Sequence, residues 1–310
     1  MNMHKIALNL KQINKSCKNQ PIVTRFAPSP TGFLHLGHIA SALFVWGIGR
    51  LLNAKILLRI EDHDQGRSRP EYVEGIFDDL DWLGLEYQVE RRKFVASEYV
   101  QSNCFLRYNQ KLQELKLAAR TFACQCSRKA IHAASPVKPG QEARYPGTCE
   151  DLQLAEGEGR ALRLRLEARH IQFDDLWLGP QSQDPRQQIH SLVLKDRVGQ
   201  WSYHFSSVVD DIIQGVNLII RGQDILSSTS RQIYLQQLLG VTSPPSYLHH
   251  PLIMQSEDKK LSKSLNSTSI QKMRANGLTP EQVLGKAAFQ VGLTSQNREL
   301  ANQDLASLFR

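Results

Sequence analysis

Apolar and polar residues follow one another along the chain in blocks that predict alternating strands and helices. Residues 22–26 form a short β-branched run between two prolines, which is typical of a buried strand. Residues 36–52 are rich in alanine, leucine and isoleucine and predict a helix, and residues 55–60 predict a second strand. A strand, a helix and a strand within about forty residues indicate a βαβ unit with parallel strands.

The rest of the chain continues this alternation. Helices are predicted where apolar residues recur at helical spacing, at residues 68–83, 97–117 and 228–239, and a capping box at residues 279–282 begins a helical tail. Strict alternation over residues 161–168 predicts a strand whose basic face meets solvent. The apolar run within residues 207–224 predicts further buried strands. We therefore expect an α/β fold with a doubly wound parallel sheet of the Rossmann type.

One region breaks the pattern and suggests an insertion. Residues 122–151 are rich in proline and glycine and contain three closely spaced cysteines. The predicted organisation is a poorly ordered N-terminal extension (1–20), two halves of the α/β domain (21–118 and 196–265), an inserted module (119–195) and a helical tail (266–310).

Composition narrows the class of protein. Hydrophobic residues make up 41% and charged residues 22% of the 310 residues, which is ordinary for a globular protein. The net charge of +8 suits a polyanionic partner. No apolar run approaches the roughly 20 residues of a membrane helix, so we expect no membrane partner. Five cysteines, an odd number that includes a C-x-C pair, indicate a reducing compartment and predict a cytoplasmic protein.

The stretch "PSPTGFLHLGH" directly follows the first predicted strand. Ligands of open α/β sheets bind beyond the carboxyl ends of the strands, and the amides at a helix start favour phosphate. Gly32 and Gly37 allow a ligand to approach the backbone closely. His35 and His38, three residues apart, share one helix face and can donate hydrogen bonds to a phosphoryl group.

A second basic stretch, "KKLSKS", lies in a predicted loop near residue 260. Alone, such a cluster could be solvated surface charge. Downstream of the histidine motif in the same domain, it is a candidate clamp for a triphosphate, because lysine is a point charge suited to phosphate.

The three clustered cysteines, Cys124, Cys126 and Cys149, form a candidate metal site. Three thiolates suit tetrahedral zinc, which needs a fourth ligand from nitrogen or oxygen. His132 is one candidate, since imidazole is a common zinc ligand. We expect a structural site with no open coordination position.

These stretches together resemble class I aminoacyl-tRNA synthetases over roughly residues 21–265. "PSPTGFLHLGH" and "KLSKS" resemble the two ATP-binding motifs, and "RFAPSPTG", "RIEDHD" and "IIRGQDIL" resemble the glutamyl branch. The resemblance implies that glutamate is activated with ATP and Mg²⁺ to glutamyl-adenylate. It implies His35, His38 and Lys263 as catalytic residues. The implied ATP-binding residues are Pro28, Gly32, His35, Gly37, His38, Lys260, Leu261, Ser262, Lys263 and Ser264.

The resemblance also implies a glutamate pocket formed by Arg25, Phe26, Ala27, Pro28, Ser29, Glu61, Tyr203 and Arg221. Chemistry supports this set: a guanidinium fork suits a carboxylate, and an acid such as Glu61 suits the ammonium group. C-x-C followed by Y-x-x-x-C resembles the zinc module of bacterial members, which favours Tyr145 over His132 as the fourth ligand.

The acceptor of the glutamyl group is the finer question. Residues 265–310 are too few for an independent anticodon-binding domain, so we expect a member without one. Resemblance to such members implies transfer to queuosine at the wobble position of tRNA(Asp), with ATP, L-glutamate and that anticodon loop as partners. Two alternatives stay open: a truncated synthetase that charges the 3′ end of tRNA(Glu), and a non-catalytic paralogue that binds tRNA or amino acid.

Overall fold

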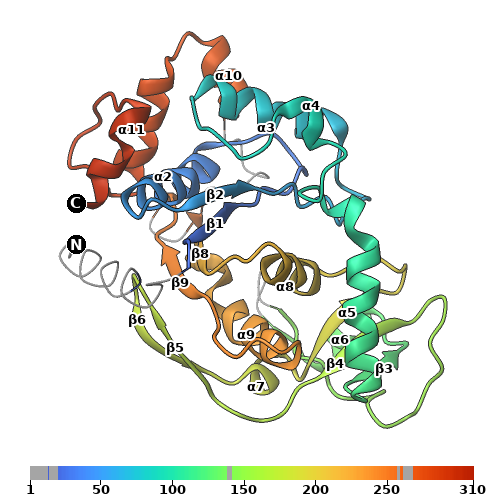
Figure 1. Ribbon diagram of the computed structural model, residues 1–310. Helices are drawn as coiled ribbons and strands as arrows, with labels where there is room; N and C mark the ends of the chain where they lie inside the picture. Colours follow the sequence, from blue (N-terminus) through green and yellow to red (C-terminus); the bar gives the residue numbers. More distant parts are fainter. Residues whose placement is uncertain (1–12, 14–19, 138–141, 257–258, 261–267) are drawn as a thin grey trace.

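A sheet assembled from both halves of the chain forms the centre of the computed structural model (Figure 1). The structure describes residues 13, 20–137, 142–256, 259–260 and 268–310. Two parallel pairs of strands form the middle of the sheet: β9 (Ser246–His250) pairs with β8 (Leu218–Gly222), and β1 (Val23–Phe26) pairs with β2 (Lys55–Leu58). The amide of Asn217 donates to the carbonyl of Val23 at 3.1 Å and joins β8 to β1. The predicted parallel pairing of the first two strands is confirmed.

Two further strands extend this sheet beyond β9. β5 (Ile171–Asp175) pairs with β9 in parallel at Asp175 and Tyr247, and β6 (Gly179–Gln183) adds an antiparallel edge. Both strands come from the range that the sequence assigns to the inserted module, and they extend the main sheet.

Side chains alternate between the two faces of the sheet and enter two apolar cores. One core takes Phe26, Leu58, Leu218, Ile220 and Leu248, and the other takes Val23, Leu57, Ile219 and Tyr247. Helices α2 (Leu36–Leu51), α3 (Pro70–Trp82) and α11 (Pro280–Gln290) and the 3-10 helix η3 (Asn302–Phe309) cover the first core. Helices α5 (Phe105–Leu117), α8 (Tyr203–Ile213) and α9 (Thr229–Leu238) cover the second (Figure 1). The fold is thus the α/β architecture that the alternation predicts.

The cysteine-containing module has its own small sheet. β3 (Thr121–Cys124), β4 (Ala161–Arg165) and β7 (Ser191–Lys195) pair antiparallel, beside the short helices α6 (Arg128–Ala134) and α7 (Pro185–Ile189). A third apolar cluster lies here, formed by Phe122, Cys124, Ile131, Tyr145, Cys149 and Ala161.

The prediction that the basic face of residues 161–168 meets solvent is wrong. Arg163 is only 6% exposed, and its guanidinium lies 4.1 Å from the centroid of the Tyr145 ring. The guanidinium of Arg165 lies 5.0 Å from the centroid of Phe122. The reason is that arginine stacks on aromatic faces, so this face of β4 packs against the cysteine module.

The apolar run at residues 207–224 is not wholly strand. Its first part belongs to α8, which Ser202 caps by accepting a hydrogen bond from the amide of Phe205, and only Leu218–Gly222 form β8. Phe205, Val208 and Val209 face the core at helical spacing, whereas Asp210 and Asp211 are buried with arginine partners. A short run rich in valine and isoleucine satisfies both periodicities, and tertiary packing decides between them.

The helix predicted at residues 97–117 is shorter. α4 (Arg91–Phe94) precedes it, the 3-10 helix η1 covers Gln101–Cys104, and α5 begins only at Phe105. The amide of Ile60 donates to the carbonyl of Tyr99, and the amide of Gln101 donates to the carbonyl of Ile60. These backbone groups extend the edge of β2 and are therefore not available to a helix.

Three details at the end of the chain bear on the motifs. The capping box at Thr279 and Gln282 forms as predicted. β10 (Met254–Ser256) and β11 (Lys259–Lys260) form a hairpin, and α10 (Ile270–Ala275) follows. Leu261, Ser262, Lys263 and Ser264 of the second motif lie outside the described residues, as do residues 1–12 and 14–19. None of the helices in the described ranges has the length and apolar character needed to cross a bilayer.

Candidate functional site

A cavity of about 500 Å³ lies beyond the carboxyl ends of β1, β2 and β8, at the start of α2. We call it the strand-end cavity. Of the residues that the sequence predicts for ATP and glutamate, those that line it are Arg25, Phe26, Ala27, Pro28, Ser29, His35, Gly37, His38, Glu61, Tyr203 and Arg221. Gly32 is not among the lining residues, and no side-chain position is described for Lys260. The structure thus brings together residues up to 196 positions apart in the chain.

The two histidines are held by the start of α2. His35 is the N-cap, and its Nδ1 accepts a hydrogen bond from the amide of Gly37 at 3.1 Å. The amide of His35 in turn donates to Nδ1 of His38 at 3.1 Å. Because both Nδ1 atoms act as acceptors, a neutral ring carries its hydrogen on Nε2 in each case. Both imidazoles are thereby prepared to act as Nε2–H donors.

Gly37 is required by the close packing of this cap. A Cβ atom at Gly37 would lie 2.9 Å from Cε1 of His35, and the rings of His35 and His38 are only 4.0 Å apart between centroids. A backbone bridge pairs His35 with Ser269, just beyond the second motif. The chain therefore returns to the histidine pair directly after the "KLSKS" stretch.

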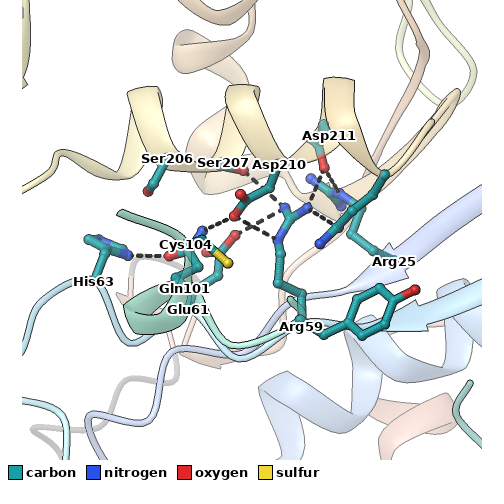
Figure 2. Close-up of polar contacts among 12 residues, drawn as sticks. Arg25, Arg59, Glu61, His63, Gln101, Cys104, Ser206, Ser207, Asp210 and Asp211 are labelled. Carbon is teal, nitrogen blue, oxygen red and sulfur yellow. Dashed lines mark hydrogen bonds and ion pairs between the residues drawn. The ribbon is translucent and has the colours of Figure 1, made fainter. Parts of the chain in front are cut away.

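A buried ion-pair network supports the floor of the strand-end cavity (Figure 2). Nε of Arg25 donates to Oδ1 of Asp211 at 3.1 Å, and Nη1 of Arg59 donates to the same oxygen at 2.8 Å. Nη2 of Arg59 also donates to Oε1 of Glu61 at 3.2 Å. Arg59 is fully buried and joins Glu61 to Asp211, with Asp210 as a third carboxylate at 3.8 Å.

Asp211 and Glu61 have opposite pKa shifts. Burial alone would raise the pKa of Asp211, but the charges and hydrogen bonds of Arg25 and Arg59 outweigh it and lower that pKa below its ordinary value. Burial raises the pKa of Glu61, and the charges of Arg59, His63 and Arg25 only partly oppose it. A ligand's positive charge beside Glu61 would therefore stabilise its ionised form.

Arg221 is fixed by a second network of buried side chains. Its Nε donates to Nε2 of His249 at 3.0 Å, and Nη2 donates to the hydroxyl of Thr229 at 2.8 Å. Nδ1 of His249 lies 2.6 Å from Oδ2 of Asp175. The side chains of His249 and Asp175 are both fully buried. Burial lowers the pKa of His249 and the charge of Arg221 adds to this, against the hydrogen bond and charge of Asp175. Because Nε of Arg221 can only donate, Nε2 of His249 accepts and the ring is neutral.

Sequence reasoning missed the buried residues that build the two networks around Arg25 and Arg221. They are Arg59, Asp175, Asp210, Asp211 and His249. Arg59 and Asp211 each interrupt an apolar run, and a charge in a buried run was the one available signal. Asp62 accepts a hydrogen bond from the amide of Ser102 at 2.8 Å.

The cysteines converge as their spacing predicts. The sulfur atoms of Cys124, Cys126 and Cys149 all lie within 4.8 Å of one another. The hydroxyl of Tyr145 accepts from the amide of Cys149 at 2.7 Å and lies 3.5 Å from the sulfur of Cys124. Among the described residues, His132 does not join this group, and it lies exposed on α6. Three sulfur donors in this arrangement could hold a metal ion such as zinc.

Comparisons with known proteins agree with this geometry. The chain is 37% identical to the glutamyl-Q tRNA(Asp) synthetase of Nitratidesulfovibrio vulgaris, over 92% of this chain and 90% of that protein. It is also 37% identical to a glutamate–tRNA ligase 2 of Cereibacter sphaeroides, over 86% of this chain and 60% of that protein.

A solved glutamate–tRNA ligase from Elizabethkingia meningosepticum, in complex with its amino acid, has the same fold, with a TM-score of 0.74 at 22% identity. The match covers 94% of this chain and 65% of that structure. Residues 21–307 match the family described as "tRNA synthetases class I (E and Q), catalytic domain". The chain therefore belongs to the class I tRNA synthetases of the glutamate and glutamine type.

Proposed function

We propose that this protein activates L-glutamate with ATP and transfers the glutamyl group to queuosine at the wobble position of tRNA(Asp). The observation that carries the first step is the convergence of two Nε2–H histidines, two fixed arginines and one buried acid on the strand-end cavity. The second step is supported by the similarity to a glutamyl-Q tRNA(Asp) synthetase over nine tenths of both chains. We propose that the activity is cytoplasmic, as the odd number of cysteines also predicts.

Activation joins the glutamate carboxylate to the α-phosphorus of ATP. The carboxylate oxygen attacks, the bond to the bridging oxygen breaks, and pyrophosphate leaves with the electron pair. Negative charge moves onto phosphate oxygens, where Nε2–H groups of His35 and His38 stabilise it. Lys263 is the proposed contact of the leaving pyrophosphate, with the neighbouring residues of "KLSKS", and Mg²⁺ accompanies ATP and neutralises part of its charge.

Glutamate is recognised by donors that the protein leaves unused. Arg25 donates Nε to Asp211 and Nη1 to the carbonyl of Ile220. Its Nη2 makes no hydrogen bond to another described residue, so it can bind a carboxylate. Arg221 has five N–H donors and uses one each on Nε, Nη1 and Nη2 for its protein partners. The other N–H groups on Nη1 and Nη2 can bind the same ligand. The carboxylate of Glu61 accepts hydrogen bonds from the ammonium group, and Tyr203 forms part of the pocket wall.

We also propose that Cys124, Cys126 and Cys149 hold one structural zinc ion, with the hydroxyl of Tyr145 as the fourth ligand. The convergence of three sulfur atoms supports this, because zinc accepts thiolates in a closed tetrahedral site. The site ties β3 to the loop that carries Cys149, and so supports the small sheet of β3, β4 and β7.

Two assays test the proposed function separately. Glutamate-dependent exchange of labelled pyrophosphate into ATP tests activation, and it is expected without any tRNA. Transfer of labelled glutamate is then compared on tRNA(Asp) with queuosine, tRNA(Asp) with guanosine at that position, and tRNA(Glu). We expect label only on the queuosine-containing tRNA. Charging of unmodified tRNA(Glu) instead would overturn the proposed acceptor, and absence of exchange would overturn catalysis.

A further inference from the structure

A second cavity of about 700 Å³ lies between the α/β body and the cysteine module. We call it the module cavity. Its walls come from the carboxyl end of β2, from α6, from β7 and from the start of α8, and they include His63, Arg128, Gln200, Trp201 and Tyr203. Tyr203 lines the strand-end cavity as well. The two cavities therefore share Tyr203 as a wall residue.

The walls of this cavity suit a hydroxyl-rich ligand attached to a phosphate backbone. Arg67 and Arg128 line it and are exposed to solvent, as phosphate contacts require. Farther in, Ser191, Gln200 and the carboxyl group of Asp196 offer both donors and acceptors. The side chains of Arg128 and Gln200 make no hydrogen bond to another described residue, so both remain able to bind a ligand.

His63 is the wall residue whose hydrogen-bonding state the structure defines. Nε2 of Gln101 donates to Oδ2 of Asp210 at 2.7 Å, which leaves Oε1 of Gln101 as the acceptor facing His63 (Figure 2). Nδ1 of His63 lies 2.8 Å from that oxygen and must donate to it. A neutral His63 ring therefore carries its hydrogen on Nδ1 and an unprotonated lone pair on Nε2.

Neighbouring side chains fix the hydrogen bonds among His63, Gln101 and Asp210 in one arrangement. Gln101 and Asp210 are both completely buried, and Asp210 also accepts from the hydroxyl of Tyr108 at 2.9 Å and from Arg107. The Gln101 side-chain amide is hydrogen-bonded through both its oxygen and its nitrogen, so it cannot flip without losing two hydrogen bonds. The ring of His63 lies 6.4 Å from the ring of Tyr203 between centroids, at the boundary of the two cavities. An unprotonated imidazole nitrogen thus lies on a residue that lines the module cavity, next to the tyrosine that both cavities share.

We propose that the module cavity receives the hydroxyl-bearing ring of the acceptor nucleoside, and that Nε2 of His63 takes the proton from the attacking hydroxyl. The hydroxyl oxygen forms a bond to the carbonyl carbon of glutamyl-adenylate. The bond from that carbon to the phosphate oxygen breaks, and AMP leaves with its electron pair. The proton moves to Nε2, so an ester, AMP and an imidazolium result. This inference rests on the proposed function, since it names the acceptor site of that reaction.

Single-turnover transfer from preformed glutamyl-adenylate to queuosine-containing tRNA(Asp) tests the base. His63→Asn keeps a donor near the position of Nδ1 and removes Nε2, and we expect its transfer rate to fall by roughly 10²–10⁴-fold. His63→Ala should lose a similar factor and regain activity with added imidazole, which a purely structural role would not produce. A transfer rate in His63→Asn within threefold of the wild type, or no rescue of His63→Ala by imidazole, would overturn the assignment. Loss of pyrophosphate exchange in these variants would assign His63 to activation and overturn it as well.

A pair of neighbouring residues on α6 tests the cavity itself. Arg128 lines it, whereas Lys129 is exposed on the same helix and does not. The probe is the anticodon stem-loop of tRNA(Asp) with queuosine, titrated by calorimetry. We expect Arg128→Glu to weaken binding at least about tenfold, and Lys129→Glu to stay within about twofold. Equal weakening by both would show general surface attraction and overturn the cavity assignment.

The outcomes separate this inference from the proposed function. If the wild type does not transfer glutamate to queuosine-containing tRNA(Asp), the proposed function falls and the inference falls with it. If the wild type transfers and the His63 and Arg128 variants match it, only the inference is overturned. A stem-loop without queuosine that binds as tightly as the modified one would also overturn it.

Discussion

Arg25 and Asp211 are 186 positions apart in the chain and form a buried ion pair, with 3.1 Å between Nε and Oδ1. The side chains of both are 4% exposed. The same oxygen holds Arg59, so one carboxylate on α8 positions an arginine of β1 and one that follows β2. The orientation of the glutamate pocket therefore depends on a helix that the sequence suggests to be strand.

Asp211→Asn should impair glutamate binding more than ATP binding. The change leaves Arg25 and Arg59 buried without their shared counter-charge, and breaking such a pair destabilises a protein by about 3–5 kcal/mol. We expect the KM for glutamate in pyrophosphate exchange to rise at least tenfold, by about 1.4 kcal/mol or more, with a much smaller change for ATP. Exposed Asp174→Asn, on β5, is the matched control and should leave both values unchanged. Equal effects of Asp211→Asn on both substrates would contradict this positioning role.

His38→Asn separates the catalytic hydrogen from the helix cap. Asparagine can still accept the hydrogen bond from the amide of His35 through its side-chain oxygen, but it has no Nε2–H. We expect kcat of pyrophosphate exchange to fall by roughly 10²–10³-fold, with thermal stability close to that of the wild type. His38→Ala should lose the same activity and also about 1 kcal/mol of stability, because the cap is lost. Wild-type exchange in His38→Asn would show that the imidazole hydrogen has no catalytic part.

The cluster of Cys124, Cys126 and Cys149 predicts one bound metal ion per chain, whose binding requires the three thiol groups. Cys149→Ser should abolish bound zinc in elemental analysis and lower the melting temperature, because the proposed metal would link β3 to the loop of Cys149. Tyr145→Phe should weaken zinc retention against a chelator without abolishing it. Buried Cys104 lies outside the cluster, so Cys104→Ser is the control and should keep full metal content. Unchanged zinc in Cys149→Ser would refute the ligand set.

Asp79 on α3 predicts a stability that depends on pH. Burial raises its pKa to about 7, the charge of Asp78 adds to this, and Oδ2 has no partner among the described residues. Because the pKa of Asp79 is higher in the folded than in the unfolded state, ionisation of Asp79 lowers the free energy of unfolding, and this cost is complete above pH 7. Asp79→Asn should therefore raise the free energy of unfolding at pH 8, on the order of 1–3 kcal/mol. This gain should shrink as the pH falls through 7 toward 4, as measured by urea denaturation. An advantage that stays constant from pH 8 to pH 4 would contradict the assigned cause.

Local features of the site could be predicted because neighbours in the chain produce them. His35 and His38 form the helix cap with each other and with Gly37, so the spacing in "HLGH" already contains that geometry. The parallel pair β1 and β2 follows from two β-branched runs around one helix. The convergence of Cys124 and Cys126 likewise depends on a C-x-C spacing.

The errors occur where distant partners decide. The apolar and polar residues at 207–213 do not alternate strictly enough to exclude a helix. Burial of Asp210 and Asp211 becomes favourable only beside Arg25, Arg59 and Arg107. Arg163 appears exposed in an alternating strand until the ring of Tyr145 lies over it. In both cases burial of a charge depends on a counter-charge or an aromatic face from elsewhere in the chain.

The sequence by itself determined the strand–helix–strand core, the histidine cap and the cysteine spacing, because their interactions are local. Only the tertiary structure decided that Arg59 joins Asp211 to Glu61, that Asp175 and His249 orient Arg221, and that Gln101 sets the tautomer of His63. Those contacts join residues from separate strands and helices. Their strength comes from removing charges and hydrogen-bonding groups from water together, a condition that exists only once the chain has folded.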